Sequence, residues 1–252
     1  MEGGVMKSLN IVILVSGIVL SLVSVNQTVM AKGKAPVYNV IEVKNGGTIA
    51  GTVKLEGGVP AAKMLKIDKD EQTCGHGLKA SEDLVINSGN MGIKNAVVSL
   101  DSIEVGKALD TTPVSLDQKG CVFEPHVVAV CAGTEVNLLN SDPIMHNLHS
   151  WSIRNPAFNE GVSGNGKMVK KFDVPEIVKI TCDVHKWMSS YLLVKGNPYF
   201  AVTDADGKFR IDNVPAGTYE ISVWQEKLGK RKSEAVVTAG GEVVVDFVYQ
   251  KK

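Results

Sequence analysis

The stretch ITCDVHKWMSSY (residues 180–191) places a thiol, an imidazole and a thioether within seven positions. Cys182, His185 and Met188 follow the spacing C-x2-H-x2-M, in a chain that has only 5 His and 4 Cys. Thiolate and thioether are soft ligands that suit Cu(I), and imidazole serves both oxidation states of copper. The stretch therefore predicts part of a metal site.

Other uses of this stretch fit the residues less well. Structural zinc takes four N/S ligands, a c-type haem needs C-x2-C-H, and iron–sulfur clusters need three or four spaced thiolates. A binuclear copper centre needs a second Cys in the loop, and a Cys nucleophile needs an oxyanion site and a third, orienting group. What remains is a mononuclear copper site with two His, one Cys and a weak axial Met.

The second imidazole of such a site has to come from another strand, because this loop is too short to provide all the ligands. The upstream stretch NSDPIMHNLHS supplies two candidates, His146 and His149. His76 and His126 have no partner at ligand spacing, and we expect both at the surface or in loops. Trp151 and Trp224 are expected in the core.

The elements that position these residues are predicted to be strands. Short runs rich in Val, Ile, Thr and Tyr recur between clusters of Gly, Pro, Asn and Asp: TIAGTVKL, NAVVSL, VVAVCA, EVNLLN, MVKKFDV, IVKITC, SYLLVK, KFRIDNV, TYEISVW and EVVVDFVY. Strands of this length and spacing are typical of an all-β sandwich or barrel. Little helix is expected.

Residues 112–196 resemble the cupredoxin (small type 1 blue-copper protein) family, of the amicyanin/plastocyanin-like kind. The resemblance rests on F-x-P…A-G-T-E-V…N-S-D…H-N-x-H…C-x2-H-x2-M. It implies a Greek-key β-sandwich with one copper ion held by His146, Cys182, His185 and Met188. It also implies that Asn147 braces the ligand loops and offers its backbone N–H to the Cys sulfur, while the His149 side chain points elsewhere. Asp183-Val184 departs from the family, whose loops more often carry a Pro here.

A second resemblance concerns TDADGKFRIDNVPAGTYEISV (residues 203–223), which is similar to the carboxypeptidase regulatory-like (transthyretin-type) β-sandwich. The opening strands of such a sandwich are similar to G-T-I-A-G-T-V (residues 47–53) and N-A-V-V (residues 95–98). We therefore expect residues 40–110 and 198–250 to be two halves of one host sandwich, with the copper domain (112–196) inserted between them. The alternative is three consecutive pieces.

The N-terminus predicts export. Lys7 precedes the apolar run IVILVSGIVLSLVSV (residues 11–25), and Val29-Met30-Ala31 offers a cleavage site, so residues 1–31 are expected to be a signal peptide. The alternative is an uncleaved membrane anchor. We expect a periplasmic or secreted protein without a stable membrane span after cleavage.

Disulfides are permitted in that compartment. Four Cys suggest two disulfides, but a ligand role for Cys182 leaves one pair and one odd thiol. We expect the pair to be Cys74–Cys121, because Cys131 precedes a turn in VVAVCAG and is expected to point outward. The sequence leaves the pairing open.

The predicted function is one-electron transport between redox partners, without enzymatic activity. Equal numbers of basic and acidic residues, 27 each, argue against a nucleic-acid partner. A redox protein is expected to dock transiently at an exposed edge of His185, which would be surrounded by Pro143, Ile144, Met145 and Trp187. The alternatives are a copper-binding or delivery module and a sandwich that binds carbohydrate or protein without catalysis.

Overall fold

The structure is a computed structural model that describes Met1 and residues 38–251. The expected signal peptide, residues 1–31, lies outside the described residues apart from Met1. Within the part described, no helix is both long and apolar enough to cross a membrane. The expectation of an all-β protein is confirmed, since the helix that the described residues contain, α1 (Glu71–Cys74), has four residues.

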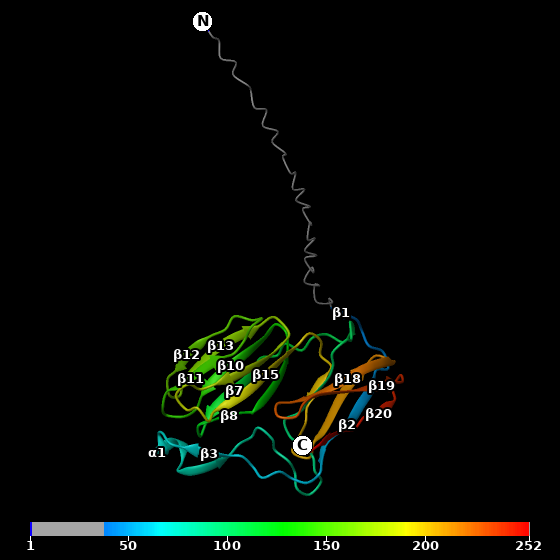
Figure 1. Cartoon of the computed structure of the whole chain (residues 1–252). Coiled ribbons are helices and arrows are strands. Elements are labelled where there is room, and N and C mark those ends of the chain that lie inside the picture. Colours follow the sequence, from blue (N-terminus) through cyan, green and yellow to red (C-terminus); the bar gives the residue numbers. More distant parts are fainter. Residues whose placement is uncertain (2–37, 252) are drawn as a thin grey trace. The chain divides into compact units, whose positions relative to one another are not determined.

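One β-sandwich, here called the middle sandwich, is formed by residues 114–195 (Figure 1). Its first sheet has the order β13-β10-β7-β8, and its second has the order β12-β11-β14-β15-β9. Alternate residues of its strands face a shared core: on β10, Val136, Leu138 and Asn140 are buried. The strands are β7 (Val114–Lys119), β8 (Val122–Glu124), β9 (Val127–Cys131), β10 (Thr134–Asn140), β11 (His146–Ser150), β12 (Asn159–Val162), β13 (Lys167–Phe172), β14 (Glu176–Thr181) and β15 (Ser189–Lys195).

A second sandwich, here called the flanking sandwich, combines strands from both sides of the middle one. Figure 1 shows blue β2 beside orange and red strands from the end of the chain. β2 pairs with β17, β20 and β21, whereas β5 pairs with β16 and β18. The strands are β2 (Gly47–Glu56), β5 (Val97–Leu100), β16 (Phe200–Val202), β17 (Lys208–Val214), β18 (Gly217–Gln225), β19 (Gly229–Val237), β20 (Glu242–Val244) and β21 (Phe247–Gln250).

These pairings confirm the expected fold class, two β-sandwiches built from short strands. The predicted run EVVVDFVY divides into β20 and β21, because the chain leaves the β2 ladder between Val244 and Phe247. Whether the flanking strands form one folding domain, with residues 112–196 as an insert, stays a prediction.

A short segment between β2 and β5 packs against the middle sandwich rather than the flanking one. We call residues 64–80 the cap segment: β3 (Met64–Ile67), α1 and β4 (Gly77–Ala80), with β3 and β4 paired antiparallel. Ile67 and Cys74 are buried in the middle core, whereas Met64 and Leu78 are exposed. A separate two-stranded pair joins β1 (Asn39–Val40) to β6 (Val105–Gly106).

Candidate metal centre

Three of the predicted ligands meet at one end of the middle sandwich. His146 begins β11, Cys182 follows the last residue of β14, and His185 lies in the turn between β14 and β15. One potential ligand atom from each residue lies within 4.8 Å of the other two, and all three residues are buried. Nδ1 of His146 is 2.9 Å from Nδ1 of His185, which in turn lies 3.7 Å from Sγ of Cys182.

The turn that carries the ligands is closed by its own backbone. The Met188 N–H donates to the His185 carbonyl at 2.9 Å, and the Cys182 N–H donates to the Met188 carbonyl at 3.3 Å. These bonds hold the two ends of the C-x2-H-x2-M stretch together. Met188 is buried in the core of the middle sandwich and belongs to the same apolar cluster as Cys182.

The sulfur of Cys182 accepts two backbone hydrogen bonds, which suits a thiolate. Asn147 N and His185 N both lie 3.4 Å from Sγ. The Asn147 side chain also reaches across to the ligand turn, where its Oδ1 accepts from the Asp183 N–H at 3.0 Å. Asn147 therefore links β11 to the turn and contributes a donor to the sulfur.

Both imidazoles bind a carboxylate through the nitrogen that faces away from the other ring. Nε2 of His146 is 2.8 Å from Oδ2 of Asp142, and Nε2 of His185 is 2.8 Å from Oδ2 of Asp70. A carboxylate that accepts a hydrogen bond from Nε2–H keeps the ring proton on Nε2 and leaves the lone pair on Nδ1. Neither carboxylate was expected from the sequence, although Asp142 stands in the same NSDPIMH stretch as His146.

Electrostatics keep His146 in the form that a metal needs. Burial lowers the pKa of His146 and the neighbouring His185 lowers it further, whereas the hydrogen bond with Asp142 opposes both effects. A lowered imidazole pKa means a neutral ring at neutral pH, with one nitrogen free to act as a ligand.

The structure does not have the exposed edge of His185 that was expected. His185 is 0% exposed, because Asp70 of the cap segment covers its Nε2 and the Trp187 ring lies 5.0 Å away between centroids. Met145 is 56% exposed and Pro143 is exposed too, so two members of the expected apolar patch reach the surface without the imidazole. The expectation failed because the cap segment, more than 100 residues upstream, occupies the space next to Nε2 of His185, which was expected to be open to solvent.

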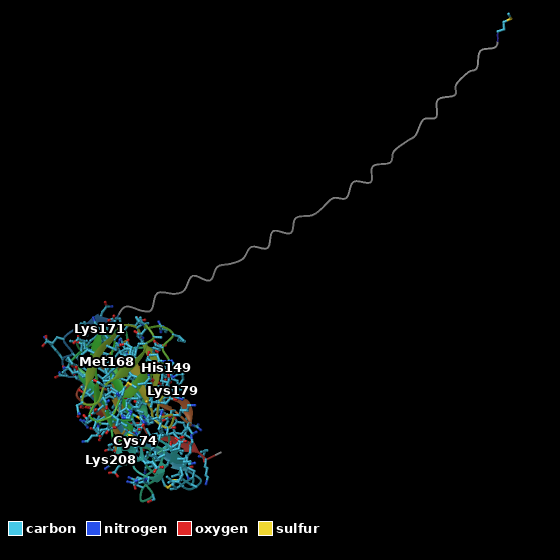
Figure 2. The ribbon with its side chains drawn as sticks, turned by 90° about the vertical axis from the view of Figure 1, so that its left-hand side faces the viewer. Cys74, His149, Met168, Lys171, Lys179 and Lys208 are labelled. Carbon is cyan, nitrogen blue, oxygen red and sulfur yellow. A yellow bond between two sulfur atoms is a disulfide. The ribbon has the colours of Figure 1, made fainter. Side chains whose placement is uncertain are left out.

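His149 lies outside the ligand cluster, on the outer face of the second sheet. Its Nδ1 is 3.1 Å from both carboxylate oxygens of Asp183, and its ring stacks on Trp151 with centroids 4.1 Å apart. Trp151 was expected in the core but is 56% exposed. Buried His146, Leu148 and Ser150 alternate with outward residues along β11, so strand alternation puts Trp151 outside. Figure 2 labels His149 and Lys179 on this side of the molecule.

Cys74 and Cys121 are joined by a disulfide, and Cys131 and Cys182 are free. The reason given for this pairing was wrong, since Cys131 is buried and its thiol lies 3.9 Å from the Asn197 carbonyl. The chain segment that follows β15 covers the end of β9.

A second group of potential ligand atoms is formed by Cys121, Asp142 and His146. Cys121 is part of the disulfide, has no free thiol and cannot act as a ligand.

Of the two histidines expected at the surface or in loops, one is exposed and one is buried. His76 is exposed and contacts Glu71 at 2.7 Å. His126 is buried and pairs with Glu226, which follows β18 of the flanking sandwich. His126 does lie in a loop, the connection between β8 and β9, but it is not at the surface, because it pairs with a residue 100 positions away. Trp224 is half-buried and packs edge-on against Tyr191.

The donor set fits a mononuclear copper ion. One nitrogen of each imidazole and one sulfur lie within 4.8 Å of one another, and a thioether residue lies in the same turn. Nitrogen and sulfur donors of this kind, with the thiolate shielded from solvent, are those of electron-transfer copper. The hydrogen bonds to Nε2 and Sγ fix the donors without using their ligand atoms.

Comparison with family models agrees with the expected resemblance to the carboxypeptidase regulatory-like domain. The model of the carboxypeptidase regulatory-like domain matches residues 192–250. No curated protein matches the chain.

Among solved structures, the chain is similar to a copper-containing nitrite reductase from Thermus scotoductus, with 23% identity and a TM-score of 0.31; the match covers 35% of this chain and 23% of that one. A purple cupredoxin from Nitrosopumilus maritimus shares 18% identity over 32% of this chain and 99% of its own, with a TM-score of 0.29. Amicyanin from Paracoccus versutus shares 18% over 33% and 81%, with a TM-score of 0.29. The chain thus spans about a quarter of the reductase, and likenesses at this level imply neither a shared ligand nor a shared activity.

Proposed function

We propose that the protein is an extracytoplasmic copper protein that carries one electron at a time between redox partners and is not an enzyme. The observation that carries the proposal is the convergence of His146, Cys182 and His185 within 4.8 Å in a buried site. Copper bound there would supply the Cu(I)/Cu(II) couple. Ligands held by strands and by hydrogen bonds need little rearrangement between the two oxidation states.

The roles follow from the donor atoms. His146 and His185 provide Nδ1, Cys182 provides the thiolate, and Met188 provides the weak axial thioether. Asn147 and the backbone of His185 donate to the sulfur. All three convergent donors are buried, which favours electron transport over catalysis on a bound substrate.

The compartment is part of the same proposal. A disulfide between Cys74 and Cys121 suits an oxidising environment such as the periplasm or the cell exterior. The partner would be a redox protein in a transient complex of small area. Because the cap segment covers His185, a partner that docks next to this residue would contact the cap segment.

The decisive experiment is optical. Copper-loaded protein is expected to show an intense visible thiolate-to-copper band, which Cys182→Ser abolishes. Cys131→Ser is the matched control, since Cys131 is also a free, buried thiol but lies away from the ligand cluster; the band should persist in that variant. A colourless Cu(II) form of the unaltered protein would overturn the proposal.

A further inference from the structure

Asp70 reaches the candidate metal centre from a part of the chain that the ligand motifs do not include. Its Oδ2 lies 2.8 Å from Nε2 of His185, across 115 sequence positions. The His185 side chain is fully buried, and that of Asp70 is 41% exposed. The carboxylate therefore forms the outer wall of the site on the side of His185.

The contact has a counterpart at the other imidazole. Asp142 binds Nε2 of His146 in the same way, at 2.8 Å. Each carboxylate accepts from Nε2, so each holds its ring with Nδ1 directed towards the other imidazole. The occurrence of the same carboxylate–imidazole contact at both rings indicates that these pairs position the ligands.

Asp70 lies four residues before a disulfide that ties its segment to the middle sandwich. It has a left-handed backbone conformation, with φ of 50°, and its carbonyl accepts from the N–H groups of Thr73 and Cys74. Cys74 is bonded to Cys121 of the middle sandwich. Apart from Ile67 and Cys74, the cap segment buries little apolar surface, and such segments open at low free-energy cost unless they are tethered.

Cys121 connects the two carboxylates. Its N–H donates to Oδ2 of Asp142 at 2.8 Å, and its carbonyl accepts from Nε1 of Trp187 at 3.0 Å. Through the disulfide it also holds the turn that presents Asp70. The same residue thus organises the partners of both imidazoles.

We propose that Asp70 is a positioning residue for the His185 ligand and that the Cys74–Cys121 disulfide holds Asp70 next to His185. The identity of the metal rests on the proposed function, but the positioning of the imidazole does not require a metal. Copper affinity should therefore depend on a disulfide that contributes no ligand.

The first test uses metal-free protein and nitrogen NMR of the His185 ring. We expect the Nε2–H tautomer in the unaltered chain and a mixture with the Nδ1–H tautomer in Asp70→Gly, which tolerates the positive φ. Asp70→Asn keeps an acceptor oxygen and should restore the single tautomer. Asp68→Asn, a nearby carboxylate outside the site, is the control.

The second test measures Cu(I) affinity by competition with a chelator. Loss of a partner to a ligand imidazole typically weakens metal binding by about 10–100-fold, and we expect that loss in Asp70→Gly and in the double variant Cys74→Ser/Cys121→Ser. Adding Asp70→Gly to the double variant should cause no further loss, because both changes remove the same contact.

The outcomes separate the two proposals. An unchanged tautomer and affinity in Asp70→Gly, or losses that add in the triple variant, would overturn the role of Asp70 and the disulfide. Asp70→Gly leaves the disulfide intact, so the result does not depend on whether the double variant folds. If Asp70→Gly changes the tautomer but the unaltered protein forms no visible copper band, the positioning role would be supported and the proposed function would be contradicted.

Discussion

His126 and Glu226 pair their side chains in the interior of the protein, one hundred positions apart in the chain. Their side chains are 5% and 7% exposed. His126 precedes β9 of the middle sandwich, and Glu226 follows β18 of the flanking sandwich. The pair thus joins the two sandwiches, next to an apolar contact among Val97, Val127 and Leu193.

Removing one member of this pair should be costly. Glu226→Ala leaves His126 buried without its partner, and we expect the free energy of unfolding to fall by about 3 kcal/mol. Replacing both residues by Leu should cost less, since no buried polar group is then left unpaired. Urea denaturation measures both values, with the exposed Glu234→Ala as control. Equal losses in the single and double variants would show that the pair contributes only packing.

Glu176 predicts how stability changes with acid. Burial alone would raise the pKa of Glu176, but hydrogen bonds from Ser152, the backbone of Ile153 and Asn155 lower it from 4.5 to about 2. A carboxylate with a depressed folded-state pKa stabilises the fold above its unfolded pKa and ceases to do so as the pH falls through its folded pKa. Its contribution is therefore complete above about pH 4.5 and is lost towards about pH 2.

The comparison is between the unaltered protein and Glu176→Gln. At neutral pH we expect the variant to be less stable by about 1.5–3 kcal/mol, the value of a hydrogen bond to a charged group. Thermal unfolding should show this difference shrinking across the acid window, whereas exposed Glu135→Gln should show no such trend. A difference that stays constant down to the lower limit would contradict the assignment.

The sequence allowed the fold class and a local ligand motif to be predicted, because both leave short-range patterns. Strand alternation and turn residues indicate two sandwiches, and C-x2-H-x2-M lies within one turn. The covering of His185 by Asp70 and the burial of His126 were missed. Both features depend on contacts between residues 115 and 100 positions apart. A contact between residues so far apart produces no recognisable pattern in the sequence around either residue.

Other errors could have been avoided with the same sequence. Trp151 continues the outward-facing register of Asn147 and His149 on β11, so alternation alone places it at the surface. Cys131 is different, because the chain that covers its thiol, at Asn197, belongs to the link between the two sandwiches. Only the tertiary arrangement determines that contact.

Met188 offers a test that distinguishes a ligand from a core residue. Leu has nearly the volume of Met, so Met188→Leu should keep the fold at a cost below about 1.5 kcal/mol. If the thioether is the axial ligand, copper-loaded Met188→Leu should shift its visible band and its reduction potential. Met168→Leu, a partly buried Met on β13, is the control. An unchanged spectrum would assign Met188 to packing alone.

The relation between the two sandwiches can be tested by cutting the chain once. Thr111 and Thr112 are exposed and lie between β6 and β7, so a protease site inserted there should be cleaved without loss of structure. β2 and β5, on the N-terminal fragment, pair with β16, β17, β18, β20 and β21 of the other fragment.

Because these ladders fix the two fragments to each other, they should elute together in native size-exclusion chromatography and separate only in denaturant. The experiment requires Cys74→Ser/Cys121→Ser, since the disulfide would otherwise join the fragments covalently. If β2 and β5 belonged to an independent N-terminal domain, the two fragments would separate under native conditions. Co-elution of the fragments would instead support a host sandwich into which residues 112–196 are inserted.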